Sequence, residues 1–237
     1  MMSGKRWGYV VQFFCLLVFL GMSPFLIKMD GRKTMSVSSD SVRSQNVSDE
    51  VKPVVALTFD DGPNASSTPI LLDGLKERKV RATFFLIGEN VEKDENEKIV
   101  KRMYEEGHLI GNHTYTHCNL SKLETGEAKK ELEQTDTVIE KITGKQPVFV
   151  RAPYGELPVD SEQDLNRIYI GWTVDPLDWM TEDVSRITQS VLEKVEPGDI
   201  ILLHDSYLSS VQAALRIVDA LQGKGYEFIT VDQMISD

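Results

Sequence analysis

Thr58–Pro63 reads TFDDGP and directly follows the apolar run Val54–Leu57. A short run of this composition that ends in a turn predicts a buried strand. Asp60 and Asp61 then stand side by side at its end, where two carboxylates repel each other unless a cation or an arginine meets at least one of them. The glycine and proline that follow predict a sharp turn. The stretch alone also fits an ordinary solvated turn, so its meaning depends on the rest of the chain.

Short apolar or β-branched runs alternate with longer amphipathic segments from here to the C-terminus. The predicted strands are Val54–Phe59, Ala82–Leu86, Leu109–Asn112, Val148–Arg151, Tyr169–Thr173, Ile200–His204 and Glu227–Thr230. The predicted helices are Thr68–Arg78, Asn96–Glu106, Thr125–Thr143, Asp183–Val195 and Ser209–Lys224. Alternation of this kind predicts an α/β fold with a parallel sheet. Seven strands over about 185 residues fit a distorted, closed or nearly closed (β/α) barrel better than a doubly wound sheet, and no Gly-x-Gly-x-x-Gly loop follows the first strand.

The first 50 residues differ from the rest in composition. Residues 1–6 include two basic residues and are predicted to be cytoplasmic, and residues 7–27 form an uncharged stretch of 21 residues that is long enough to span a bilayer. We expect a transmembrane signal-anchor there, with a cleaved signal peptide as the alternative. Residues 28–50 are polar and serine-rich and predict a flexible linker. Residues 51–237 are then a single domain outside the cytoplasm, anchored to the membrane or secreted.

Charge and cysteine content limit the partners and the compartment. Residues 1–49 hold six of the 26 basic and three of the 37 acidic residues, so the remainder carries 20 positive and 34 negative charges, a net charge of −14. This acidity argues against nucleic acid as a partner. Cys118 is the only cysteine of the domain, which therefore has no internal disulfide. An exported domain without one indicates a bacterial cell surface.

Polar residues gather at the carboxyl ends of the predicted strands. They are Asp60, Asp61, His113, His117, Arg151, Asp178 and His204. In a (β/α) barrel, the loops at this end converge and form the active site. Solvated acids and core histidines would not be expected to collect at one rim, so the placement predicts a catalytic site.

His113 and His117 are separated by three residues, close enough to bind one metal ion from a tight loop or a helical turn. With one aspartate they would form a site of two histidines and one carboxylate, which leaves positions open for water and substrate. Non-haem iron oxygenases use the same set of ligands, but on a β-sandwich scaffold that this alternation of strands and helices does not match. An isolated pair of this spacing is more often found on the surface of a helix.

Five separated motifs resemble those of the NodB-like polysaccharide deacetylases, which form carbohydrate esterase family four. The motifs are TFDDGP at Thr58–Pro63, HTYTH at His113–His117, RAPYG at Arg151–Gly155, DPLDW at Asp175–Trp179, and Leu202–His204. They occur in the order and spacing of the family and cover the domain from about Val54 onward. The resemblance implies the NodB homology fold and metal-dependent removal of acetyl groups from a glycan.

The resemblance also implies a metal site and a general base. Asp61, His113 and His117 would bind a divalent metal, zinc foremost and cobalt as the alternative, whose bound water ionises near neutral pH. Asp60 would take the proton of that water. Arg151 would hold Asp60 as an ion pair that keeps its direction fixed.

The remaining roles implied by the resemblance concern the leaving group and the acetyl group. His204 would be the general acid that protonates the departing amine, and Asp178 would hydrogen-bond to it and raise its pKa. The backbone N–H of Tyr154 would stabilise the oxyanion in a turn shaped by Pro153. Finally, the acetyl methyl group would lie in a pocket walled by Trp179 and Leu202.

The predicted substrate is an N-acetylated glycan. Peptidoglycan leads because an anchored bacterial domain faces the wall, and N-acetylglucosamine is favoured because family members that act on N-acetylmuramic acid often depart from the double aspartate. Chitin oligomers and O-acetylated xylan are the alternatives within the family. Two alternatives lie outside the active enzymes of this family. The first is a catalytically silent glycan-binding domain, and the five intact motifs argue against it. The second is a metal-dependent phosphoesterase, which would need more basic residues near the metal.

Overall fold

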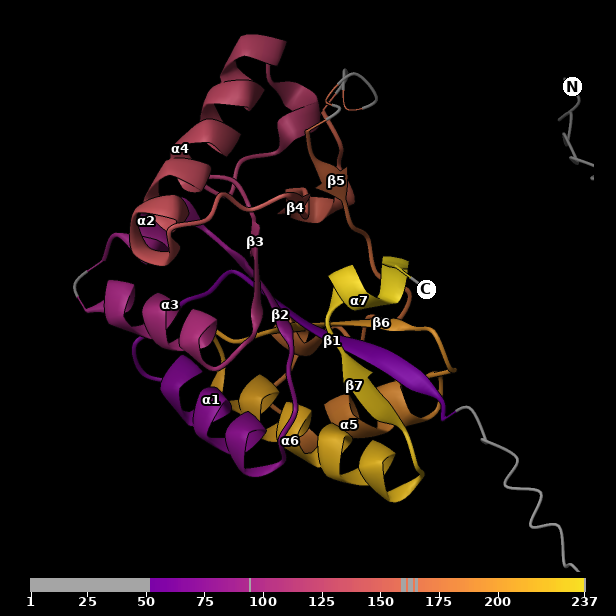
Figure 1. The fold of residues 1–237 in the computed structure, drawn as a ribbon. Coiled ribbons are helices and arrows are strands. Elements are labelled where there is room, and N and C mark those ends of the chain that lie inside the picture. The colour runs from indigo at the N-terminus through magenta and orange to yellow at the C-terminus, as the bar shows by residue number, and fades with distance from the viewer. Residues whose placement is uncertain (1–51, 94, 159–160, 162–163, 165, 237) are drawn as a thin grey trace, which may run out of the picture. The chain divides into compact units, whose positions relative to one another are not determined.

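β1 (Val54–Asp60) pairs with three other strands of a parallel sheet, and the two aspartates of TFDDGP lie at its carboxyl end (Figure 1). The computed structural model describes residues 52–93, 95–158, 161, 164 and 166–236, which all belong to one compact unit that spans Asp49–Asp237. The predicted cytoplasmic N-terminus, membrane anchor and linker, at residues 1–50, lie outside the described residues. Within the described ranges, no helix is both long and apolar enough to cross a membrane.

Six further strands complete the sheet. They are β2 (Thr83–Leu86), β3 (Leu109–Asn112), β4 (Phe149–Val150), β5 (Ile168–Tyr169), β6 (Ile200–His204) and β7 (Glu227–Ile229). All pairings are parallel, in the order β5-β4-β3-β2-β1-β6, and β7 pairs with the first half of β1. The prediction of seven parallel strands in an α/β fold is confirmed.

The two edges of the sheet meet beyond β5. Val174 forms an isolated parallel bridge with Ile201 of β6, and its carbonyl accepts a hydrogen bond of 2.9 Å from the N–H of Leu202. We call this junction the seam. It makes the sheet a nearly closed, distorted barrel, as the sequence predicts.

The fifth strand is shorter than the predicted Tyr169–Thr173, because β5 ends at Tyr169. Arg151 explains the difference. Its Nε donates to the carbonyl of Ile170 at 3.3 Å and its Nη2 donates to that of Gly171 at 2.8 Å. Carbonyls that accept from a guanidinium no longer need a neighbouring strand as partner, so the chain leaves the sheet here.

Five helices follow the pattern predicted from the sequence. They are α1 (Thr68–Glu77), α3 (Asn96–Glu105), α4 (Thr125–Thr143), α5 (Val184–Leu192) and α6 (Leu208–Gly223). Asp183, predicted as the first residue of α5, is its N-cap and accepts from the N–H groups of Ser185 and Arg186. Two further helices, α2 (Gly88–Val91) and α7 (Val231–Ser236), were not predicted, because segments this short show no helical periodicity.

The two faces of β1 have different surroundings. Val55, Leu57 and Phe59 belong to the large core that the strands form with the outer helices. Successive side chains of a strand point to opposite faces, so Thr58 and Asp60 face the interior of the barrel. Both are buried, and they lie at the level where the strands end. The alternation of β1 therefore delivers one carboxylate into the mouth of the barrel.

Candidate active site

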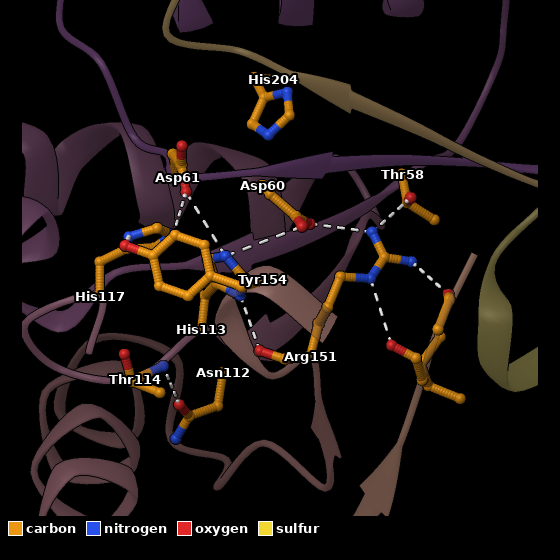
Figure 2. Close-up of polar contacts among 12 residues, drawn as sticks. Thr58, Asp60, Asp61, Asn112, His113, Thr114, His117, Arg151, Tyr154 and His204 are labelled. Carbon is orange, nitrogen blue, oxygen red and sulfur yellow. Dashed lines mark hydrogen bonds and ion pairs between the residues drawn. The ribbon is translucent and has the colours of Figure 1, made fainter. Parts of the chain in front are cut away.

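Asp60 and His204 are register partners on the neighbouring parallel strands β1 and β6. Paired residues on parallel strands point to the same face of the sheet, so the two side chains share the mouth of the barrel. Figure 2 shows the imidazole of His204 on the opposite side of Asp60 and Asp61 from His113 and His117. The residues predicted as acid and base thus flank a common space.

Asp61, His113 and His117 form a cluster whose ligand atoms all lie within 4.8 Å of one another. Asp61 Oδ1 lies 3.4 Å from His113 Nε2 and 3.2 Å from His117 Nε2. This oxygen is buried and accepts no hydrogen bond from any described residue. The three side chains come from the ends of β1 and β3, as the strand-end pattern predicts.

The orientation of His113 shows what the cluster can hold. Its Nδ1 lies 2.7 Å from the carbonyl oxygen of Arg151, which can only accept, so Nδ1 carries the proton and Nε2 presents a lone pair. Burial lowers the pKa of His117, which favours the neutral imidazole that metals bind. Burial alone would raise the pKa of Asp61, but the neighbouring imidazoles hold it below its usual value. Two imidazole lone pairs and a carboxylate converge, and a divalent cation fits this set.

Left-handed backbone conformations surround the cluster. Asp61 has φ 71°, Thr114 has φ 66°, His117 has φ 59° and Tyr154 has φ 63°. Residues other than glycine keep such conformations only where their surroundings enforce them, and they collect at functional sites. The phenol of Tyr154 stands edge-on to His117, with its oxygen 3.3 Å from Nδ1.

Arg151 is fully buried beneath the cluster, with all three guanidinium nitrogens bonded. Nη1 donates to Asp60 Oδ1 at 2.9 Å and to Thr58 Oγ1 at 2.7 Å, and the guanidinium carbon stacks 4.2 Å from the ring centroid of Phe85. The pair engages Oδ1 of Asp60, whereas Oδ2 faces His113 Nε2 at 3.7 Å. One oxygen of Asp60 is therefore fixed and the other faces the metal-ligand cluster (Figure 2).

Asp178 anchors His204 twice. Its Oδ2 accepts from the backbone N–H of His204 and its Oδ1 from Nδ1, each at 2.8 Å. Burial alone would lower the pKa of His204, but the hydrogen bond and charge of Asp178, helped by two further carboxylates, raise it to about 9. Since Nδ1 is engaged, the proton free for transfer is on Nε2.

The remaining predicted residues surround this group. Pro153 is buried and begins the turn that holds Tyr154, and the side chain of Tyr154 is exposed. Leu202 precedes His204 by two residues on β6 and so points to the same face, where it is buried. Trp179, next to Asp178, is 53% exposed and offers an apolar surface at the rim.

A comparison with protein families covers the same motifs. The sequence profile of the family described as polysaccharide deacetylase matches residues 48–170, a range that holds TFDDGP, HTYTH and RAPYG. The chain belongs to the polysaccharide deacetylase family.

Several relatives of this chain are named as deacetylases of peptidoglycan or of chitooligosaccharides. A peptidoglycan-N-acetylglucosamine deacetylase of Bacillus cereus is 42% identical over 190 residues, which cover 77% of this chain and 68% of that protein. The peptidoglycan-N-acetylmuramic acid deacetylase PdaC of Bacillus subtilis is 38% identical and covers 82% of this chain, but this chain matches only 41% of its length. The solved structure of PdaC matches with a TM-score of 0.75 and covers 78% of this chain and 91% of that one. A chitooligosaccharide deacetylase of Bradyrhizobium sp. is 37% identical, covering 76% of this chain and 90% of that protein.

Two residues that the sequence analysis missed lie beside the predicted site residues. Glu131 of α4 binds the loop between His113 and His117, because its Oε2 accepts from the N–H groups of Tyr115 at 3.0 Å and Thr116 at 2.8 Å. One acid among many on an amphipathic helix gives no signal in the sequence. Asp205 follows His204 directly and is fully buried, which raises its pKa to about 7. In the sequence, only its position next to the predicted acid, His204, could have drawn attention to it.

His108, predicted to be structural, is buried below the barrel mouth. Its Nδ1 accepts from the N–H of Ala82, and burial lowers its pKa to about 4. A neutral histidine that only accepts a backbone hydrogen bond fits that structural assignment.

Proposed function

We propose that this protein is a metal-dependent deacetylase that removes N-acetyl groups from a cell-surface glycan, with N-acetylglucosamine of peptidoglycan as the leading substrate. The observation that carries the proposal is the convergence of a two-histidine, one-aspartate cluster with Asp60 on one side and His204 on the other. The names of its peptidoglycan-deacetylating relatives support the choice of polymer. The predicted anchor at residues 7–27 would place the domain outside the cytoplasm, against the wall.

The metal would be held by Asp61, His113 and His117. When bound, a divalent metal, zinc foremost and cobalt as the alternative, supplies a more acidic water and polarises the acetyl carbonyl. The carbonyl of Arg151 orients the imidazole of His113 through Nδ1, and burial lowers the pKa of His117. Glu131 holds the loop between the histidines and so fixes their spacing.

Asp60 would accept the proton of the attacking water on Oδ2, the oxygen that faces the cluster. Arg151, whose Nη1 also donates to Thr58 Oγ1, holds the other oxygen, so the carboxylate cannot rotate away. A general base in a fixed direction is worth about 10²- to 10⁴-fold in rate. The backbone N–H of Tyr154 would donate to the oxyanion that forms at the acetyl carbon.

His204 would then donate the proton of Nε2 to the departing amine, which is a poor leaving group without it. Asp178 keeps the imidazole charged and oriented for this step. The exposed indole of Trp179 and the buried side chain of Leu202 would enclose the acetyl methyl group.

We expect Asp178→Asn to move the basic limb of the pH–rate profile to lower pH. A general acid must be protonated, so wild-type activity should fall as the pH rises through the His204 pKa of about 9. The asparagine keeps the size of Asp178 but lacks its charge, so the His204 pKa should move toward the ordinary value of about 6.5. Measurement of kcat between pH 5 and pH 10 checks this; an unchanged basic limb would exclude His204 as the acid that this limb reports.

We expect removal of the metal to abolish acetate release without unfolding the domain. The full chain in mild detergent would be treated with a chelator, then given zinc or cobalt, with N-acetylated peptidoglycan and chitin oligomers offered side by side. Release that returns with metal supports the proposal and ranks the substrates. Circular dichroism before and after chelation provides the control for folding.

The same assay, extended to acetylated xylan and a phosphoester and with the deacetylated sugar identified, separates the alternatives. Release only from chitin oligomers, from acetylated xylan or from N-acetylmuramic acid units would change the substrate but not the chemistry. Glycan binding without release, by a folded and metal-loaded chain, would favour a catalytically silent glycan-binding domain. Release of phosphate from a phosphoester, with no acetate from any glycan, would favour a phosphoesterase.

A further inference from the structure

Asp205 lies one residue beyond His204, and none of the roles above uses it. Its carboxyl is fully buried, and Oδ2 accepts a hydrogen bond of 2.5 Å from Thr68 Oγ1. Its backbone carbonyl accepts another of 2.5 Å from Ser67 Oγ. Oδ1 receives no hydrogen bond from any residue that the structure describes. A buried carboxyl with one oxygen unpaired is costly, so its retention at this point needs a reason.

The carboxyl of Asp205 packs directly against Gly62, the residue that follows the metal-site aspartate. A methyl group added to Gly62 would lie 2.6 Å from Oδ1 and 2.6 Å from Oδ2, and its three nearest atoms would all belong to Asp205. The backbone of Gly62 is not left-handed, unlike that of Asp61. Glycine is therefore required here by the closeness of the carboxyl and not by backbone conformation.

Hydrogen bonds hold the same turn from the other side. The carbonyl of Asp61 accepts from Asn90 Nδ2 at 2.7 Å, and the carbonyl of Gly62 accepts from the N–H of Ile87 at 3.1 Å. The turn thus lies between the residues that follow β2 and the carboxyl that follows β6. Contacts on both sides enforce the left-handed conformation of Asp61, whose φ is 71°.

A chain of hydrogen bonds extends this contact to the start of α1. The N–H of Asn64 donates to Thr68 Oγ1 at 2.8 Å, and Thr68 Oγ1 donates in turn to Asp205 Oδ2. Asp205 therefore connects both ends of the segment between β1 and α1 to the strand end that carries His204.

We propose that Asp205 is a positioning residue whose carboxyl holds the turn at Gly62 and so directs the side chain of Asp61 toward His113 and His117. The inference rests on the metal site proposed above. It makes the residue after the general acid a support for the opposite half of the site, so the metal ligands and the acid are held in one relative position.

Zinc affinity tests the inference without any need for turnover. The full chain in mild detergent would be freed of metal, and its zinc dissociation constant measured by competition with a chromophoric chelator, at a temperature where every variant is folded. We expect Asp205→Ala to weaken zinc binding by about tenfold or more, the range found when groups that orient metal ligands are removed. Asp205→Asn keeps the volume and an acceptor for Thr68, so its affinity should remain within about threefold of the wild type, by the same reasoning.

A compensating pair of substitutions distinguishes positioning from a general loss of stability. Gly62→Ala should weaken zinc binding, because its methyl group collides with the carboxyl of Asp205. Adding Asp205→Ala to Gly62→Ala should then improve zinc binding over the single variant, although each change alone weakens it. Gly126→Ala is the matched control, because an added methyl group there meets no atom within 4 Å, and its zinc affinity should be unchanged.

Two results would overturn the inference while the metal site stands: wild-type zinc affinity in folded Asp205→Ala, or a double variant that binds zinc no better than Gly62→Ala. Failure of the wild-type chain to bind zinc would instead remove the proposed metal site, and this inference with it. Melting temperatures of the metal-free variants, measured in parallel, show that differences in affinity do not come from unfolding.

Discussion

Asp60→Asn is expected to lower kcat for acetate release by about 10²- to 10⁴-fold, the usual contribution of a general base. The amide has the size of the carboxylate and can still accept the hydrogen bond from Arg151, so the fold and the metal site should persist. What it loses is the ability to take a proton on the atom that replaces Oδ2. Acetate release by the purified variant measures the loss of activity, and its zinc content shows whether the metal site persists.

The control for this variant is Asp73→Asn, which neutralises an exposed carboxylate that pairs with Arg102 on the surface. Its kcat should equal that of the wild type. A fully active Asp60→Asn enzyme would refute the assignment of Asp60 as the base. Loss of zinc from that variant would show that Asp60 is a metal ligand instead.

Arg151→Met is expected to lower the free energy of unfolding by about 3–5 kcal/mol, the usual cost of removing one partner of a buried ion pair. The variant would leave the carboxylate of Asp60 buried without a counter-charge. It would also leave the carbonyls of Ile170 and Gly171 without the donors that now bind them. Activity should fall as well, because nothing would hold Asp60 toward the cluster. Denaturant unfolding and kcat at a temperature where the variant is folded measure the two effects.

Arg78→Met is the matched control. Arg78 also pairs with an aspartate, Asp219, to which it makes two hydrogen bonds, but it does so at the surface between α1 and α6. Exposed pairs contribute about 0–1 kcal/mol, so stability should change little and activity should not change. If the two variants lost the same free energy of unfolding, burial would not be the reason that the Arg151–Asp60 pair stabilises the fold more than the surface pair does.

The local sequence pattern was sufficient to predict those segments whose structure is determined by their own residues. β1 alternates between core and barrel interior, and it ends within one residue of the prediction because the paired aspartates and the turn end the apolar run. The gathering of the polar residues at one rim follows from the topology alone, since parallel strands place their carboxyl ends together. Their catalytic roles stay predictions until the variants are measured.

Tertiary contacts determine the features that the sequence analysis missed, and such contacts leave no local pattern in the sequence. β5 ends early because Arg151, which follows β4, donates hydrogen bonds to the carbonyls beyond it. Glu131 supports the loop between His113 and His117 from a helix that carries four other acids, and nothing in its spacing sets it apart from them. Asp205 is adjacent to a predicted catalytic residue, but its contact with Gly62 joins positions 143 residues apart. Side-chain to backbone contacts of such long range cannot be read from periodicity.

The two edges of β6 are paired to different extents. β6 is joined to β1 along five register pairs, whereas its other edge is held by backbone hydrogen bonds with Thr173 and Val174 and by the carboxylate of Asp178. Backbone amides with few supporting hydrogen bonds exchange with solvent through small local openings. We therefore expect the amide of Leu202, which donates across the seam, to exchange with deuterium sooner than those that join β1 to β6.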